Sequence, residues 1–250
     1  MKFLKERPAL VLDELEKKTL VISDLHLGLE YEIYKRGIRI PPRVEKQRKR
    51  IFNLLDETDA ERLILLGDVK HNVPTTSASE KKNLPSFFRD LSERAEVKIT
   101  KGNHDGNIEE LIKDSSIGIE PTNGFREGDF YFNHGQSWPS EQVKQSKILI
   151  RGHSHPAVKF EDSLGFSSKV PCWVRGPVKR GVLRERFGSG AKTEEILIVP
   201  AFNEIITGMP MNEDREKRLL GPILENGIMD VDESKVYLLD GTYIGRLEDL

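Results

Sequence analysis

Short runs of apolar residues recur along the first 150 residues of the chain, and each run leads into a polar cluster. Such short runs, bounded by glycine and polar residues, predict buried β-strands. The runs lie at 20–22, 63–66, 97–100, 130–132 and 148–150.

Two longer segments between the early runs, 43–57 and 79–93, mix apolar with charged residues and predict helices. Alternation of strand and helix is typical of a sheet covered by helices. In such sheets ligands bind at the carboxyl ends of the strands. All the polar clusters follow predicted strands at that end, so we expect their side chains to converge.

The pattern changes after residue 160. Segments 194–199, 236–239 and 243–247 predict strands, with a helix only around 213–220. We interpret them as a second sheet that packs on the first within one domain covering residues 1–250.

Composition places few limits on partners, because 39 Lys and Arg nearly balance 41 Asp and Glu. Cys172 is the only cysteine, which rules out an intrachain disulfide and favours a reducing compartment. We expect its thiol to be a small buried apolar group.

No apolar run approaches the ~20 residues that span a bilayer. The N-terminus carries charges where a signal peptide needs apolar residues. A cytoplasmic protein without a membrane partner is therefore predicted.

Carboxylate, imidazole and amide groups at the predicted strand ends form a candidate metal site. Asp24 and His26 stand two positions apart, so on an extended strand both leave the same face and can bind one ion. Asp68 has two oxygens and can bridge two ions. Asn103 and His134 offer an oxygen and a nitrogen for the second ion.

His153 and His155 repeat the two-residue spacing and can supply one ligand to each ion. Imidazole with carboxylate and amide oxygen suits two divalent ions of Mn²⁺, Ni²⁺, Fe or Zn²⁺ rather than Ca²⁺, and we expect Mn²⁺. Two such ions ~3.5–4 Å apart activate a bridging water and clamp the attacking and leaving oxygens. That chemistry predicts hydrolysis of a phosphate ester.

Each fragment alone also has a structural interpretation. A lone histidine is usually structural, and Gly102-Asn103-His104-Asp105 could be an ordinary turn. The ordered set at successive strand ends favours the functional interpretation.

The set D-x-H, G-D, G-N-H-D, H and G-H-x-H, from Asp24 to His155, resembles the calcineurin-like metallophosphoesterase family over about half of the chain. The resemblance implies an α/β (α+β) fold, a four-layer αββα sandwich of two mixed sheets flanked by helices. It also implies hydrolysis by a hydroxide that bridges the metals. His104 is implied as the general acid for the leaving oxygen, a role that suits an imidazole near neutral pH. It assigns one ion to Asp24, His26, Asp68 and His155, and the other to Asp68, Asn103, His134 and His153.

A narrower resemblance, in 67–74, 151–157 and 200–203, is to the archaeal branch related to DNA-ligase-associated phosphoesterases, which implies phosphodiester hydrolysis. Many relatives carry a histidine where this chain has Gln136, so the substrate preference does not transfer directly. In the double-strand-break repair nuclease branch, a histidine at the spacing of His71 assists near the phosphate. His71 is thus expected either to orient His104 or touch the phosphate, or to cap a turn as an ordinary loop histidine.

Two basic stretches, 35–50 and 175–186, offer either a phosphate-tracking surface for nucleic acid or a solvated helix face and a basic loop. The scarcity of aromatic residues in both favours the second interpretation. The leading function is therefore a phosphodiesterase. The alternatives are a nuclease linked to DNA repair and a catalytically silent scaffold, although scaffolds of this type lose the acid histidine or several ligands. The sequence leaves the oligomeric state open.

Overall fold

The computed structural model describes residues 1–113, 116–213 and 220–250. A first sheet is built from the N-terminal half, and its strands from β3 to β6 run parallel, with β1 and β2 antiparallel at one edge. In spatial order it contains β1 (Lys2–Phe3), β2 (Leu10–Leu12), β3 (Thr19–Ile22), β4 (Arg62–Leu66), β5 (Glu96–Thr100) and β6 (Gly118–Glu120).

The second sheet is mixed, with β12, β9 and β8 parallel and the other neighbours mostly antiparallel. Its main path contains β13 (Met209–Pro210), β10 (Pro156–Glu161), β11 (Ser167–Pro177), β12 (Glu195–Ile198), β9 (Ile148–Arg151), β8 (Phe130–Asn133) and β7 (Phe125–Glu127). Beside it, β14 (Lys235–Leu238) pairs with β11 and with β15 (Tyr243–Arg246).

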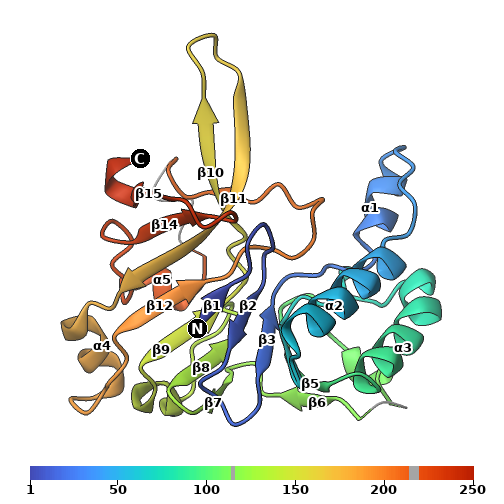
Figure 1. The fold of residues 1–250 in the computed structure, drawn as a ribbon, viewed down its shortest axis with the longest axis horizontal. Helices are drawn as coiled ribbons and strands as arrows, with labels where there is room; N and C mark the ends of the chain where they lie inside the picture. The colour runs from blue at the N-terminus through green and yellow to red at the C-terminus, as the bar shows by residue number, and fades with distance from the viewer. Residues whose placement is uncertain (114–115, 214–219) are drawn as a thin grey trace.

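The helices cover the outer faces of the two stacked sheets (Figure 1). On the first sheet lie α2 (Val44–Thr58) and α3 (Ala78–Ser92), and on the second α4 (Arg180–Phe187) and α5 (Pro222–Glu225). The helix α1 (Leu29–Lys35) follows the first motif, and short 3₁₀ helices span Ile108–Glu110, Glu141–Gln145 and Leu247–Asp249. This arrangement confirms the αββα sandwich of two mixed sheets.

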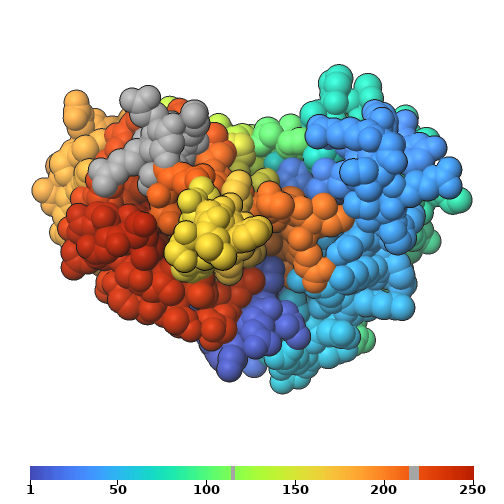
Figure 2. Space-filling model, turned by 90° about the horizontal axis from the view of Figure 1, so that it is seen from above, coloured from blue at the N-terminus to red at the C-terminus, as the bar shows by residue number. Residues whose placement is uncertain are grey.

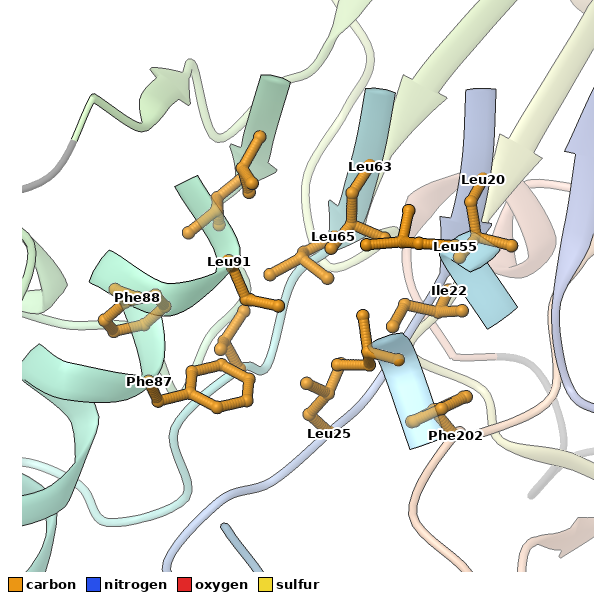
Figure 3. Close-up of a cluster of buried hydrophobic side chains, with 14 of the residues drawn as sticks. Leu20, Ile22, Leu25, Leu55, Leu63, Leu65, Phe87, Phe88, Leu91 and Phe202 are labelled. Atoms are coloured by element: carbon orange, nitrogen blue, oxygen red, sulfur yellow. The ribbon is translucent and has the colours of Figure 1, made fainter. Parts of the chain in front are cut away.

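Strand alternation explains the layers. In β4, Leu63 and Leu65 face the core under α2 and α3, while Ile64 and Leu66 face the second sheet. Figure 3 shows the helix-side core, in which Phe87, Phe88 and Leu91 of α3 approach side chains of the sheet. Both faces of β4 are therefore apolar, which is why the sequence shows a continuous run there instead of alternation.

Two parts of the second half differ from expectation. Residues 180–187, expected within a basic loop, form α4, because Leu183 and Phe187 stand four positions apart and bury one face of an otherwise charged helix. The hairpin of β10 and β11 projects from the body (Figure 1), and its outer half exposes polar residues that gave no strand signal. The helix expected around 213–220 lies almost wholly outside the described residues.

Cys172 is fully buried in the second core, as expected, and its burial raises the pKa of the thiol. Across the described residues, no helix combines the length and apolarity that crossing a bilayer requires.

The central position of β4 generates a stability prediction. Leu65→Ala removes a fully buried side chain between two sheet neighbours and should lower the free energy of unfolding by about 2–5 kcal/mol. Leu164→Ala, at a hairpin tip residue that is 81% exposed, should change it by less than about 0.5 kcal/mol. Urea unfolding followed by circular dichroism measures both, and equal values for the two variants would contradict the core placement.

Candidate metal centre

The motif residues meet at one end of the molecule. They follow the carboxyl ends of β3, β4 and β5 in the first sheet and of β8 and β9 in the second. An isolated parallel bridge between Ser23 and Ala201 joins the two sheets at this edge. A pocket of about 480 Å³ opens there, lined in part by His26, Asp68, Asn103, His104, His153 and His155. Figure 2 looks down on this end, with the β10–β11 hairpin in yellow and α1 in blue.

One cluster brings together Asp24, His26 and His155. His155 Nε2 lies 3.0 Å from Asp24 Oδ1 and 3.4 Å from His26 Nε2. The second cluster contains Asp68, His134 and His153. Asp68 Oδ2 lies 3.2 Å from His134 Nε2 and 3.5 Å from His26 Nε2 in the first cluster. A single carboxylate oxygen therefore faces both groups.

These distances fit ligands that share an ion. Two donor atoms ~2.1 Å from one metal ion lie about 3.0 Å apart at a right angle and about 3.4 Å apart at the tetrahedral angle. The observed donor separations run from 3.0 to 3.5 Å. Among the described residues, the buried atoms Asp24 Oδ1 and His134 Nε2 also have no hydrogen-bond partner of good geometry. Buried polar atoms normally have hydrogen-bond partners, so two such atoms without one suit ion ligation.

The backbone at five of these residues is left-handed, whereas an extended backbone was expected for the two pairs spaced two positions apart. The angle φ is 57° at Asp24 and 43° at His26, so the D-x-H pair is not extended as expected. His153 and His155, at 69° and 40°, are likewise not extended, and Asp68 has φ of 49°. The paired side chains converge because tight loops turn them together after the strands end. Such conformations cost about 1–3 kcal/mol each and persist where surrounding contacts determine them.

Several of those contacts come from residues to which the sequence argument gave no role. Ser23 Oγ lies 2.5 Å from Asp24 Oδ2 and 3.0 Å from the Leu66 carbonyl oxygen, and it can donate its proton to either. His134 Nδ1 lies 2.6 Å from the same carbonyl oxygen, which turns Nε2 toward Asp68. Nothing in the sequence marks a backbone carbonyl for this task.

Asp105, the last residue of G-N-H-D, ties two motif loops together. Its Oδ1 accepts the N–H groups of Val69 and Lys70 at 2.9 and 3.1 Å, and its Oδ2 accepts that of Gly102 at 2.9 Å. Burial and the neighbouring Asp68 raise the pKa of Asp105 to about 6. In the sequence, only its position beside Asn103 and His104 could have indicated a role for Asp105. Its carboxylate fixes the two loops and belongs to neither donor cluster.

His104 is held at two points. Its backbone N–H donates to Asp68 Oδ1 at 2.8 Å, which leaves Oδ2 for the two clusters. Its ring Nδ1 lies 2.5 Å from the His71 carbonyl oxygen and donates to it, so Nε2 is the ring nitrogen that remains for the pocket. The His71 carbonyl oxygen thus determines which ring nitrogen of His104 faces the pocket.

The His71 ring lies against both neighbouring imidazoles. It stacks on the His104 ring with centroids 5.1 Å apart, and its Nδ1 lies 3.1 Å from His26 Nδ1. Its Nε2 lies 2.7 Å from Glu32 Oε2. The structure therefore brings all nine residues singled out in the sequence to one site, with Asn103 placed by the pocket that it lines.

Electrostatic interactions keep the Asp68 carboxylate ionised. Burial would raise the pKa of Asp68, but His134 outweighs it and holds the value at about 2. Burial would lower the pKa of His134, but Asp68 and Asp24 raise it to about 9. Burial lowers the pKa of His26 to about 3 and that of His153 to about 4. Asp68, His26 and His153 are therefore in the forms that bind metal ions, whereas His134 would release a proton on binding one.

Comparison with known proteins identifies the family of the chain. A family model described as calcineurin-like phosphoesterase matches residues 17–165, which contain all nine residues singled out in the sequence. The chain belongs to the calcineurin-like phosphoesterase family. It is thus related to hydrolases of phosphoester bonds, a family that typically binds two divalent metals.

One solved structure shows a similar fold, and a second is reported only as a match. The nuclease MPE of Pseudomonas putida is 19% identical, with a TM-score of 0.54 over 93% of this chain and 97% of that one. The phosphoesterase Yfce of E. coli is 14% identical, with a TM-score of 0.41 over 91% of this chain and 97% of that one. No curated protein matches the sequence.

Part of each basic stretch is engaged in ion pairs with acidic residues. In the first, Arg43, Lys46 and Arg50 all lie within 3.3 Å of the Glu204 carboxylate. In the second, ion pairs join Arg175 to Glu195, Lys179 to Asp230 and Arg180 to Glu194. These contacts support the solvated-surface interpretation over a phosphate-tracking surface.

Two glycines of one loop provide a matched test of the site. A Cβ at Gly102 would lie 2.1 Å from Asp68 Oδ1, whereas a Cβ at Gly106 would meet nothing within 4 Å. We expect Gly102→Ala to displace the Asp68 carboxylate and weaken Mn²⁺ binding by about tenfold or more. Gly106→Ala should bind as the wild type does. Isothermal titration calorimetry measures both, and unchanged binding by Gly102→Ala would contradict the role given to Asp68.

Proposed function

We propose that the chain is a phosphodiesterase that uses two divalent ions, with Mn²⁺ preferred. The observation that carries the proposal is the position of Asp68 Oδ2, 3.5 Å from His26 Nε2 and 3.2 Å from His134 Nε2. One oxygen between two donor clusters is the arrangement that a pair of bridged ions requires. Such ions, when bound, lower the pKa of a water and neutralise charge on the phosphoryl group.

In this proposal the chain supplies two ligand sets and a proton. One set is Asp24, His26, Asp68 and His155, and the other is Asp68, Asn103, His134 and His153. His104 donates Nδ1–H to the His71 carbonyl, so its Nε2 is free to carry a proton toward the leaving oxygen of the ester. Because the His104 backbone N–H also donates to Asp68 Oδ1, the proposed proton donor His104 stays at a fixed distance from Asp68, the proposed bridging ligand.

A second candidate, nuclease activity, is favoured by Lys169. This exposed residue of β11 lines the pocket, and within the described part of the chain it forms no ion pair. Lys159, directly across the hairpin, is by contrast paired with Glu161 and Glu213. An unneutralised cation beside the site suits a substrate with a further phosphate, as nucleic acid has. The Pseudomonas putida protein of similar fold is a nuclease.

Two substitutions separate metal binding from proton transfer. His104→Ala should keep both Mn²⁺ ions and lose about 10²–10⁴-fold in turnover of bis(4-nitrophenyl) phosphate, because it removes only the proton donor. Asp68→Ala should lose metal binding and activity together. Calorimetry and a colorimetric rate assay measure the two quantities. If His104→Ala hydrolyses the diester at the wild-type rate, the acid is another group.

The nuclease candidate has its own test. Lys169→Ala should raise KM for single-stranded DNA and reduce the slope of log KM against log salt by about 0.7, while leaving a small diester unaffected. Lys147→Ala is the control, since Lys147 precedes β9 at the end opposite the site and pairs with Asp129. Absence of DNA cleavage by the wild type with any of Mn²⁺, Ni²⁺ or Zn²⁺ would exclude this candidate.

A further inference from the structure

Each ring nitrogen of His71 lies within hydrogen-bond distance of a side chain: Glu32, outside the two donor clusters, and His26, a member of the first cluster. Its Nε2 lies 2.7 Å from Glu32 Oε2, and its Nδ1 lies 3.1 Å from His26 Nδ1. Glu32 belongs to α1, the helix that follows the first motif. A continuous chain of hydrogen bonds therefore runs from α1 through His71 to His26.

The direction of these hydrogen bonds follows from proton counting. A carboxylate only accepts, so Nε2 of His71 carries the proton in its contact with Glu32. In a neutral ring Nδ1 of His71 then has a lone pair, and the proton in the contact between the two rings belongs to His26 Nδ1. His26 Nε2 is left with its lone pair, and it is this atom that faces Asp68 Oδ2 and His155 Nε2.

We propose that Glu32 and His71 are positioning residues that fix the tautomer and orientation of His26 for metal ligation. Histidine ligands commonly donate their other ring N–H to an acceptor, which holds the ring and raises its basicity. Here the acceptor is a second imidazole, itself held by a carboxylate. This inference depends on the proposed function, because it presupposes an ion at the cluster that contains His26.

The contacts of His71 favour this positioning role over direct contact between its ring and the phosphate. A His71 ring nitrogen that touched the phosphate would have to leave either Glu32 or His26. The ring is also fixed from its main chain, since the His71 N–H lies 3.0 Å from Glu80 Oε1 and 3.0 Å from the Leu27 carbonyl oxygen. Glu80 forms the capping box of α3, so α1 and α3 both hold the residue in place.

The hydrogen-bonded chain from Glu32 through His71 to His26, here called the relay, reaches only one of the two donor clusters. Within the described part of the chain, His134 lies against the Leu66 carbonyl oxygen, Asp24 and Asp68, and the His153 ring contacts it edge to face. Loss of Glu32 should therefore weaken the ion at the His26 cluster and spare the other. A general loss of structure would weaken both.

Manganese titration by calorimetry tests this selectivity. Glu32→Ala should weaken one of two Mn²⁺ sites by about 10–100-fold and leave the other within about twofold, with Glu32→Gln intermediate because its amide oxygen still accepts a hydrogen bond. Arg36→Gln is the matched control, since Arg36 binds the other oxygen of the same carboxylate from the exposed side. It should bind both ions as the wild type does.

The outcomes distinguish the inference from the proposed function. If the wild type binds two Mn²⁺ ions and Glu32→Ala binds both equally well, the relay is wrong and the metal centre stands. If the wild type binds no Mn²⁺, the proposed function fails and the relay with it. Equal weakening of both sites by Glu32→Ala also overturns the relay.

A second measurement reads the tautomers directly. In ¹⁵N-histidine-labelled protein loaded with Zn²⁺, long-range ¹H–¹⁵N spectra should show His26 protonated at Nδ1 and His71 protonated at Nε2. A proton on Nδ1 of His71 would reverse the hydrogen bond to His26 and contradict the proposal.

Discussion

The carboxylate of Asp68 links every part of the site. Its Oδ1 is held by the N–H of His104, and its Oδ2 lies between His26 and His134. The Asp68 carboxylate therefore fixes the positions of His26 and His134 relative to each other. It also fixes the position of His104, the proposed proton donor. A dinuclear centre needs such a shared ligand, because two cations at close range repel unless anionic oxygen lies between them.

The fold places Asp68 where it can be shared. Parallel β3, β4 and β5 bring the first two motifs and G-N-H-D to one edge of the first sheet, and parallel β8 and β9 bring the remaining histidines to the same edge of the second. The core between the sheets, which includes Val21, Ile64 and Ile150, holds the two edges together. Neither sheet alone carries both donor clusters.

Three of the site-bearing strands, β3, β4 and β8, could be predicted because both of their faces are buried. Their apolar runs are continuous, and the polar residues that follow stand out. The left-handed backbone at Asp24 and His153 could not be predicted, since nothing distinguishes these residues from an extended pair at the same spacing. Glu32 was missed for a different reason. It lies among ordinary charged residues of a short helix, and it is 39 positions away from His71 in the sequence, so only the tertiary structure shows their contact.

Anomalous diffraction from crystals grown with Mn²⁺ tests the shared carboxylate most directly. The structure predicts two manganese peaks ~3.5–4 Å apart, each on the order of 2 Å from an oxygen of Asp68. A single peak, or two peaks of which one does not contact Asp68, would contradict it.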